Sequence, residues 1–207
     1  MIRGQNFCEL VAFFERHDFH FEIHPEKPLI HMTMTGDNGS WPFMAIADDE
    51  SERFSAFSRA PIQVPVAKRA TAAEYLTRAN WGLLIGNFEM DYSDGEIRYK
   101  TAMDTDGIKL NDQLIGLTIF INLQMMDRYL PGLMTVVFGN ERPEDAVKKA
   151  EASPGDSSTG DIDTALRHLF DDAREVNPPE SDPAPQIDKT PPPPIERVRR
   201  WIHRCRR

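Results

Sequence analysis

Histidine and acidic side chains alternate near the start of the chain, where they could bind a metal ion. His20, Glu22 and His24 are separated by one residue each, so a β-strand would place all three on one face. His17 and His31 lie close by in the sequence. Imidazole and carboxylate groups are ligands that zinc accepts, but the solvent-exposed face of a strand has the same composition. Since no fourth ligand is evident, we expect an exposed strand face and no metal or cofactor.

A second polar cluster follows later, at Asp104, Asp106, Asn111 and Asp112. A calcium-binding loop needs oxygen ligands at alternate positions and a glycine at the sixth position. Gly107 comes too early for that pattern, so turn formation and helix capping explain the cluster better.

The motifs of several common enzyme classes do not occur in the sequence. It contains no GxSxG, P-loop, GxGxxG or HExxH pattern, and GDSSTG at 155–160 lacks the lysine of a P-loop. Cys8 could be a nucleophile beside a histidine, but its helical position predicts a small packed residue. Trp41 and Trp81 are expected in the core and not in a ligand-binding cage. We therefore predict no catalytic residues, with an enzyme of unrecognised site as an alternative.

The charge and cysteine content narrow the class of protein. The chain has 207 residues, a formal net charge of -9 and two cysteines, Cys8 and Cys205, outside any CxxC pair. An acidic surface repels phosphate backbones, so nucleic acid is not expected on the domain. The cysteine usage suits a reducing compartment. No signal-peptide core is present, and the apolar run 114–126 is shorter than the ~20 residues that span a bilayer. We expect a cytoplasmic protein.

The composition changes sharply after Gly139. The segment 141–207 is rich in Pro, Ser, Asp and Glu, and such a composition buries too little apolar surface to offset the entropy of ordering. We predict a folded domain over 1–140 and a disordered tail over 141–207.

Two segments of this tail carry apolar residues at helical spacing. The first, 161–176, has a stripe formed by Ile162, Ala165, Leu166, Leu169, Phe170, Ala173 and Val176. It could dock on its own domain or in a groove of a partner. The second, 195–207, is arginine-rich and has an apolar side formed by Ile195, Val198, Trp201, Ile202 and Cys205. It could contact the acidic remainder of the protein, a membrane surface or nucleic acid.

The first half of the domain reads as one helix followed by strands. Residues 6–17 have a 3.6-residue apolar period, and 19–24 change to a period of two. Strands are predicted over 29–35 and 41–47, joined by the turn sequence GDNG. A further strand is predicted over 52–59.

Prolines and glycines set the limits of the next elements. Pro61 and Pro65 are expected to end the strand at 52–59. Residues 64–84 read as a helix that Gly86 ends. The stretch 86–107 reads as an antiparallel hairpin around Asp94-Gly95, apolar on one face and charged on the other.

The last helix is predicted from Asn111, its cap, to Gly139, with a kink or a new turn at Pro131-Gly132. It is apolar nearly all round, and one sheet covers only one side of a helix. A second subunit, the 161–176 helix or a bound client should cover another side. We predict a partner or dimer surface formed by Leu117, Phe120, Ile121, Met125 and Tyr129.

The resulting order, α-β(3–4)-α-β-β-α, predicts an α+β fold with helices packed on an antiparallel sheet. This order resembles the YbjN family of bacterial proteins. The local features of the resemblance are Asn80 with Gly86-Asn87-Phe88, the hairpin Asp94-Gly95-Glu96-Ile97-Arg98-Tyr99, and Asp127-Arg128-Tyr129-Leu130-Pro131, within about residues 5–140.

The resemblance implies a fold similar to that of type III secretion chaperones. Those are small acidic homodimers that bind extended segments of other proteins and have no catalytic residues, and some YbjN proteins are described as sensory transduction regulators. We therefore expect a non-enzymatic, homodimeric, protein-binding module, chaperone-like or adaptor-like. The alternative is a regulator whose basic C-terminal end contacts membrane or nucleic acid.

Overall fold

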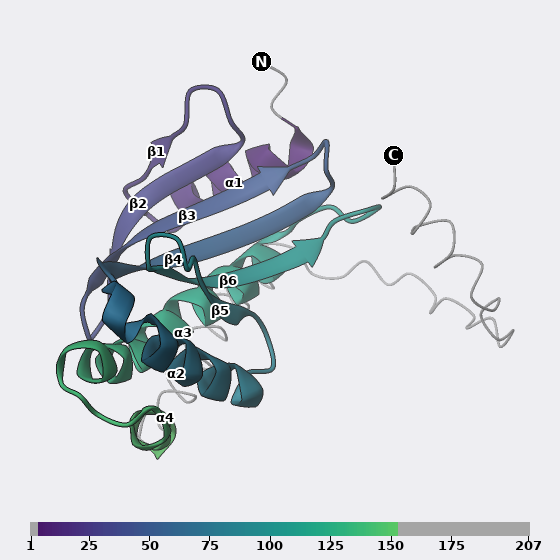
Figure 1. Ribbon diagram of the computed structural model, residues 1–207. Helices are drawn as coiled ribbons and strands as arrows, with labels where there is room; N and C mark the ends of the chain where they lie inside the picture. The colour runs from purple at the N-terminus through teal and green to yellow at the C-terminus, as the bar shows by residue number, and fades with distance from the viewer. Residues whose placement is uncertain (1–3, 153–207) are drawn as a thin grey trace, which may run out of the picture. The chain divides into compact units, whose positions relative to one another are not determined.

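The computed structural model describes residues 4–152. Its centre is a six-stranded sheet of order β1-β2-β3-β4-β6-β5, antiparallel throughout, with helices on one face (Figure 1). The elements in chain order are α1 (Gln5–Arg16), β1 (Glu22–Ile23), β2 (Leu29–Thr35), β3 (Ser40–Asp48), β4 (Arg53–Gln63), η1 (Val66–Lys68), α2 (Arg69–Gly82), β5 (Asn87–Met90), β6 (Glu96–Asp104), α3 (Asp112–Phe138) and α4 (Pro143–Ala152). The α+β prediction is confirmed.

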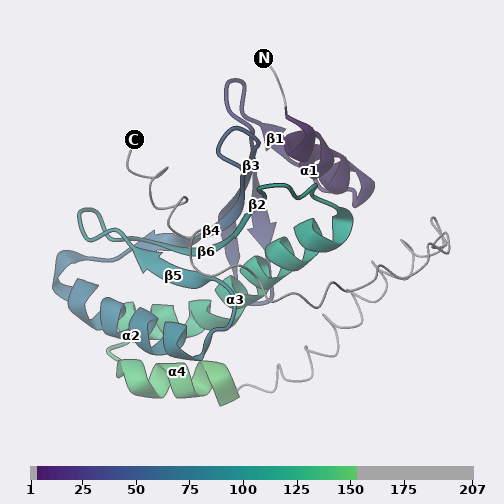
Figure 2. The same cartoon turned by 90° about the vertical axis from the view of Figure 1, so that its right-hand side faces the viewer.

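Alternation along the strands decides which face of the sheet is covered. On β3, Trp41, Phe43 and Ala45 are buried, whereas Met44 and Ile46 on the other face are partly exposed. Figure 2 shows α1 and α3 against the covered face, with α2 and α4 side by side below it. The opposite face has no helix over it within the described residues.

The long helix α3 divides the core into two clusters. Its first half packs with α1 through Ile115 and Ile119. Its second half packs with α2 and α4 through Met126, Leu133 and Val136. Between the two clusters lies Asn122, fully buried, whose Nδ2 donates to the carbonyls of Ala56 (2.9 Å) and Tyr99 (3.1 Å). This one amide ties the middle of α3 to β4 and β6.

The ends of α3 match the prediction, and no break interrupts the helix at Pro131. Asn111 caps the helix by accepting the Leu114 N–H at 2.9 Å, and the helix ends at Phe138, before Gly139. Pro131 lies inside one continuous helix. Proline has no N–H, so the carbonyl four residues earlier, that of Asp127, loses its helical donor. Asn38 Nδ2 donates to that carbonyl instead, at 3.2 Å.

Two strand predictions were wrong in extent. The strand predicted over 19–24 shrinks to β1, because only Glu22 and Ile23 pair with β2. Strand β4 continues past Pro61 to Gln63. The β4–β6 register shifts between Arg59 and Gln63, so Pro61 lies where no regular ladder hydrogen bond is needed.

One helix limit and the domain boundary also differ from the prediction. Helix α2 ends at Gly82, four residues before Gly86. The predicted boundary at 140 falls in the turn before α4, a helix that the prediction had assigned to the tail. Ala146, Val147 and Ala150 of α4 are buried against α2 and α3. Their short apolar spacing was hidden among the charges of PEDAVKKAEA, which explains the error.

Candidate protein-binding surface

A line of side chains on the exposed side of α3 has an apolar centre in the first half of the helix and mostly polar residues further on. Gln113, Leu117 and Gln124 follow each other at helical spacing on the exposed side of α3, with Ile121 beside them. Leu117 is 38% exposed. Phe120, Ile121 and Met125, which were predicted with it, are partly exposed. Phe120 and Met125 also pack against the core, so Leu117 and Ile121 are the open centre of this surface.

Tyr129, the fifth predicted member of the surface, is instead a core residue. It is buried, and its ring lies edge-on to Phe88 with centroids 5.6 Å apart. Its backbone carbonyl accepts the Tyr75 hydroxyl at 2.8 Å. The prediction was wrong because α2 and α4 of the same chain cover this part of α3.

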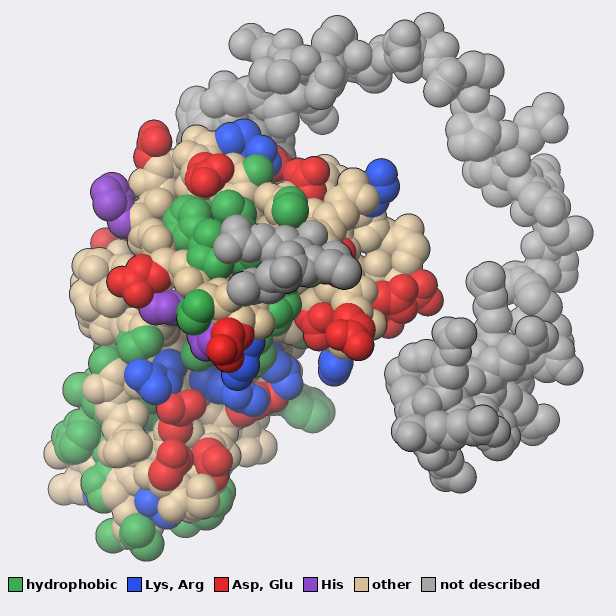
Figure 3. Space-filling view, turned by 90° about the horizontal axis from the view of Figure 1, so that it is seen from above, with side chains coloured by type: hydrophobic (Ala, Val, Ile, Leu, Met, Phe, Trp, Pro, Cys, Tyr) green, Lys and Arg blue, Asp and Glu red, His purple; other side chains and the backbone are tan. Residues whose placement is uncertain are grey.

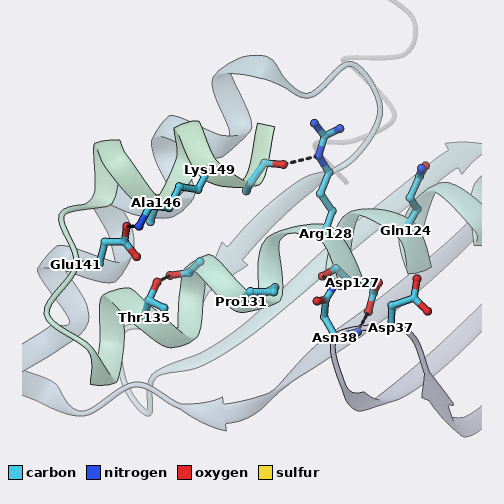
Figure 4. A pocket seen from close by; sticks show the side chains of 12 residues that line it. Asp37, Asn38, Gln124, Asp127, Arg128, Pro131, Thr135, Glu141, Ala146 and Lys149 are labelled. Carbon is cyan, nitrogen blue, oxygen red and sulfur yellow. Dashed lines mark hydrogen bonds and ion pairs between the residues drawn. The ribbon is translucent and has the colours of Figure 1, made fainter. Parts of the chain in front are cut away.

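Helix α4 is fixed over the second half of α3 by one arginine. Arg128 Nε donates to the Ala150 carbonyl at 2.9 Å, and Nη2 donates to the Glu151 carbonyl at 3.0 Å. These carbonyls lie in the last turn of α4, where helical donors are missing. A cation is favourable at this end of a helix dipole. Figure 4 shows Arg128 extending from α3 toward that turn.

A pocket of about 420 Å³ lies between α3, α4 and the β2–β3 turn (Figure 4). Glu141 and Lys149 form an ion pair in it at 2.5 Å. The hydrogen bond from Lys149 lowers the pKa of Glu141, and the same contact raises the pKa of Lys149. Asp127, another charged residue of the lining, accepts the backbone N–H of Asn38 at 2.8 Å. Glu141, Lys149 and Asp127 therefore stabilise the fold by pairing with each other or with the turn.

Three tyrosines lie under the pocket and the hairpin. Burial is the main cause that raises the pKa of Tyr75, Tyr99 and Tyr129. Their hydroxyls contact the Tyr129 carbonyl, the Ile85 carbonyl and Glu151 respectively. Raised pKa values can mark catalytic groups, but these hydroxyls join α2, α3, α4 and the loop before β5.

The uncovered face of the sheet is a second open surface. Met44, Ile46 and Phe57 are its partly exposed apolar residues, and the Arg98 guanidinium lies 4.9 Å from the centre of the Phe57 ring. Figure 3 shows hydrophobic, basic and acidic side chains interspersed over one side of the molecule. The hairpin's charged face was predicted, whereas the apolar residues of β3 and β4 beside it were not singled out. Their alternation in the sequence was the available signal.

Glu89 is the electrostatic centre of the charged part of this face. It accepts from Arg98 Nη2 at 2.7 Å and from Lys100 Nζ. Burial alone would raise the pKa of Glu89, but the hydrogen bonds from Lys100 and Arg98 outweigh it and lower this pKa.

Several of the polar side chains considered for metal binding form hydrogen bonds within turns or contact each other. His24 Nδ1 accepts the backbone N–H groups of Glu26 and Lys27, and His31 Nε2 lies 3.7 Å from Glu22. Asp104 Oδ1 accepts the Asp106 N–H at 2.9 Å. Over residues 4–152, no group of three or more His, Cys, Asp or Glu side chains is arranged to hold a metal ion.

The two tryptophans differ in environment. Trp41 is in the core as predicted, and its Nε1 donates to Ser58 Oγ at 2.9 Å. Trp81 is 93% exposed, so that prediction was wrong. Leu84 and Ile85, which follow in the loop to β5, are 99% and 48% exposed. Sequence reasoning missed this surface because an apolar run beside a helix resembles core.

Two sets of predicted residues lie outside the described part of the chain. They are the tail positions Ile162, Leu166, Leu169, Phe170, Val198, Trp201 and Ile202. Among the helices of residues 4–152, none combines the length and the hydropathy that crossing a bilayer requires.

A family model named YbjN, described as "Putative bacterial sensory transduction regulator", matches residues 9–134. The chain belongs to the YbjN family. The family predicted from the sequence motifs is thereby confirmed. A comparison with curated protein sequences gives no match.

Two solved structures are similar to this YbjN chain. A chain in the crystal structure of the ExsC–ExsE complex is 13% identical, with a TM-score of 0.42, over 63% of this chain and 94% of that one. A chain in the structure of the HopA1–SchA chaperone–effector complex is 15% identical, with a TM-score of 0.37, over 58% of this chain and 88% of that one.

The structure assigns physical roles to the motifs that carried the resemblance to YbjN. Asn80 accepts the Phe88 N–H at 2.8 Å and donates to the Phe88 carbonyl at 3.0 Å, which closes the outer edge of β5 at that residue. Gly86 has φ of +79°, and a Cβ there would lie 2.6 Å from the Lys100 carbonyl. In the segment 127–131, Asp127 and Arg128 anchor the β2–β3 turn and α4. These residues build the scaffold that leaves the α3 surface open.

Proposed function

We propose that this YbjN domain is a non-enzymatic protein-binding module, chaperone-like or adaptor-like, that acts as a homodimer. The surface formed by Leu117, Phe120, Ile121 and Met125 of α3 is the dimer or partner surface. The observation that carries the proposal is the apolar centre of that surface, Leu117 and Ile121, which stays open on the outer side of α3.

A helix face of this kind suits a two-fold dimer. In such a dimer the same patch lies on both sides of the axis, so an apolar stripe pairs with its own copy. Apolar surface removed from water contributes about 25 cal/mol per Å². A charge placed at the centre of the stripe would be buried twice, once from each copy.

The arrangement of charged groups supports binding in preference to catalysis. In the pocket between α3, α4 and the β2–β3 turn, Asp127, Arg128, Glu141 and Lys149 are already engaged in contacts that hold the β2–β3 turn and α4. A catalytic site needs a group within reach of a substrate and free to exchange a proton or a bond. The open surfaces, by contrast, are apolar side chains with charged neighbours, which is typical of protein recognition.

The test is the association state of the full chain by sedimentation velocity, with Leu117→Glu as the disrupting variant. Gln113→Glu is the matched control, since it places the same charge one helical turn earlier. We expect a dimer for the unaltered chain and for Gln113→Glu, and a monomer with an unchanged circular dichroism spectrum for Leu117→Glu. An unaltered chain that stays monomeric at high micromolar concentration would overturn the homodimer proposal.

A further inference from the structure

The loop after α2 presents large apolar side chains to solvent. Trp81 is 93% exposed and Leu84 is 99% exposed, and Ile85 follows them. We call Trp81, Leu84 and Ile85 the α2–β5 knob. Neighbouring apolar side chains that are this exposed mark an interaction surface more often than an ordinary solvent-exposed face.

The end of α4 lies near Gly82, the residue that follows Trp81 of the knob. A Cβ placed on Gly82, the residue after Trp81, would lie 3.2 Å from Glu151 Oε1. Helices α2 and α4 run side by side and end together (Figure 2). The chain therefore leaves α4 at Ala152 beside the knob.

We propose that the amphipathic segment 162–176 of the same chain docks on the α2–β5 knob. Its apolar stripe includes Leu166 and Leu169. The nine residues 153–161 separate it from α4, and at full extension they reach about 32 Å. A helix of the segment's length is about 22 Å long. The knob is therefore within reach of the stripe.

The tether favours this segment over a second copy as the occupant. A short connection converts docking into an intramolecular event with an effective concentration of about millimolar. A separate molecule reaches the knob only at its bulk concentration. A single amphipathic helix of this length is marginal in water, and an apolar surface next to its attachment point stabilises it.

Acrylamide quenching of Trp81 fluorescence tests this contact in the full-length chain. Trp201→Phe removes the tail tryptophan, and buried Trp41 stays shielded in every variant. In this background we expect Trp81 to be shielded. Leu166→Asp should raise its quenching constant several-fold, and Leu84→Asp should do the same from the other side of the contact. Thr164→Asp, which adds the same charge on the opposite side of the segment, should leave the constant unchanged.

Two results would overturn the proposal. One is a Trp81 that is as accessible in the Trp201→Phe chain as in Leu166→Asp. The other is a shielding that disappears on dilution together with a change in molecular mass, which would show that a second copy covers the knob. Shielding that is independent of concentration and is lost in Leu166→Asp supports the docking of 162–176.

Discussion

The two halves of α3 have similar hydrophobicity but different surroundings. In the second half, Leu133 is 2% exposed because α2 and α4 enclose it. In the first half, Leu117 on the outer side stays open, although α1 and the sheet bury Ile115 and Ile119 on the inner side. The chain thus covers the inner side of α3 in both halves, and the open apolar residues Leu117 and Ile121 lie on the outer side of the first half.

The cause of this difference lies outside α3. The chain turns back after Gly139 and α4 returns along the second half, where Arg128 holds its last turn. Nothing in the described part of the chain returns along the first half.

The largest effect should come from shortening a leucine on the enclosed side of α3. Leu133→Ala leaves a cavity between α3, α2 and α4, so the free energy of unfolding should fall by about 2–5 kcal/mol. At concentrations where the chain is monomeric, Leu117→Ala removes the same atoms from an open position and should cost less than about 1 kcal/mol. Urea denaturation measures both. Equal losses would show that the outer side of α3 is enclosed like its inner side.

The next effect concerns the helix that makes the halves different. Arg128→Ala removes two charged hydrogen bonds to the end of α4 and should lower the free energy of unfolding by about 1.5–3 kcal/mol. Hydrogen exchange should accelerate in α4 and stay unchanged in α1. Uniform acceleration along the chain would contradict a local role for Arg128.

A smaller effect is expected at the turn that supports Pro131. Asn38→Ala leaves the Asp127 carbonyl without the donor that replaces the missing proline N–H, which should cost about 1 kcal/mol. Asn38→Ala combined with Pro131→Ala should recover part of this loss, because alanine supplies an N–H to the same carbonyl. Thermal unfolding of the four chains measures the coupling, and its absence would disprove the link.

The smallest effect is a pH dependence on the open sheet face. The pKa of Glu89 is lowered in the folded state, so its contribution to stability is present above the ordinary glutamate pKa and is lost as the pH falls through the folded-state value. Glu89→Gln should lower stability at pH 7 by about 0.5 kcal/mol. It should also make the loss of stability in acid shallower. A variant whose acid profile is superimposable on the unaltered profile would contradict this role.

Local patterns predicted most of the fold. Alternation predicted β2, β3 and the β5–β6 hairpin, and Asn111 and Gly139 set both ends of α3, because capping and turn chemistry act over a few residues. Strand β4 was cut short at Pro61, since the register shift that accommodates this proline depends on pairing with a distant strand.

The candidate surface was less predictable than the fold. Leu117 and Tyr129 both belong to a helix that is apolar nearly all round, and nothing local indicates that the chain covers one of them and not the other. Trp81 shows the converse error, because burial depends on which segments of the chain arrive nearby. The YbjN motifs, such as Asn80 and Arg128, became interpretable only once their distant partners were known.

The most direct test is the reactivity of a single thiol in the open half of α3. Cys8 and Cys205 are replaced by serine, and Ile121→Cys provides the probe. We predict that a thiol reagent labels Cys at position 121 rapidly in dilute solution and slowly at concentrations where the chain is dimeric. A labelling rate that stays the same across the dimerisation range would contradict the account, because the first half of α3 would then be open to water in the assembled protein.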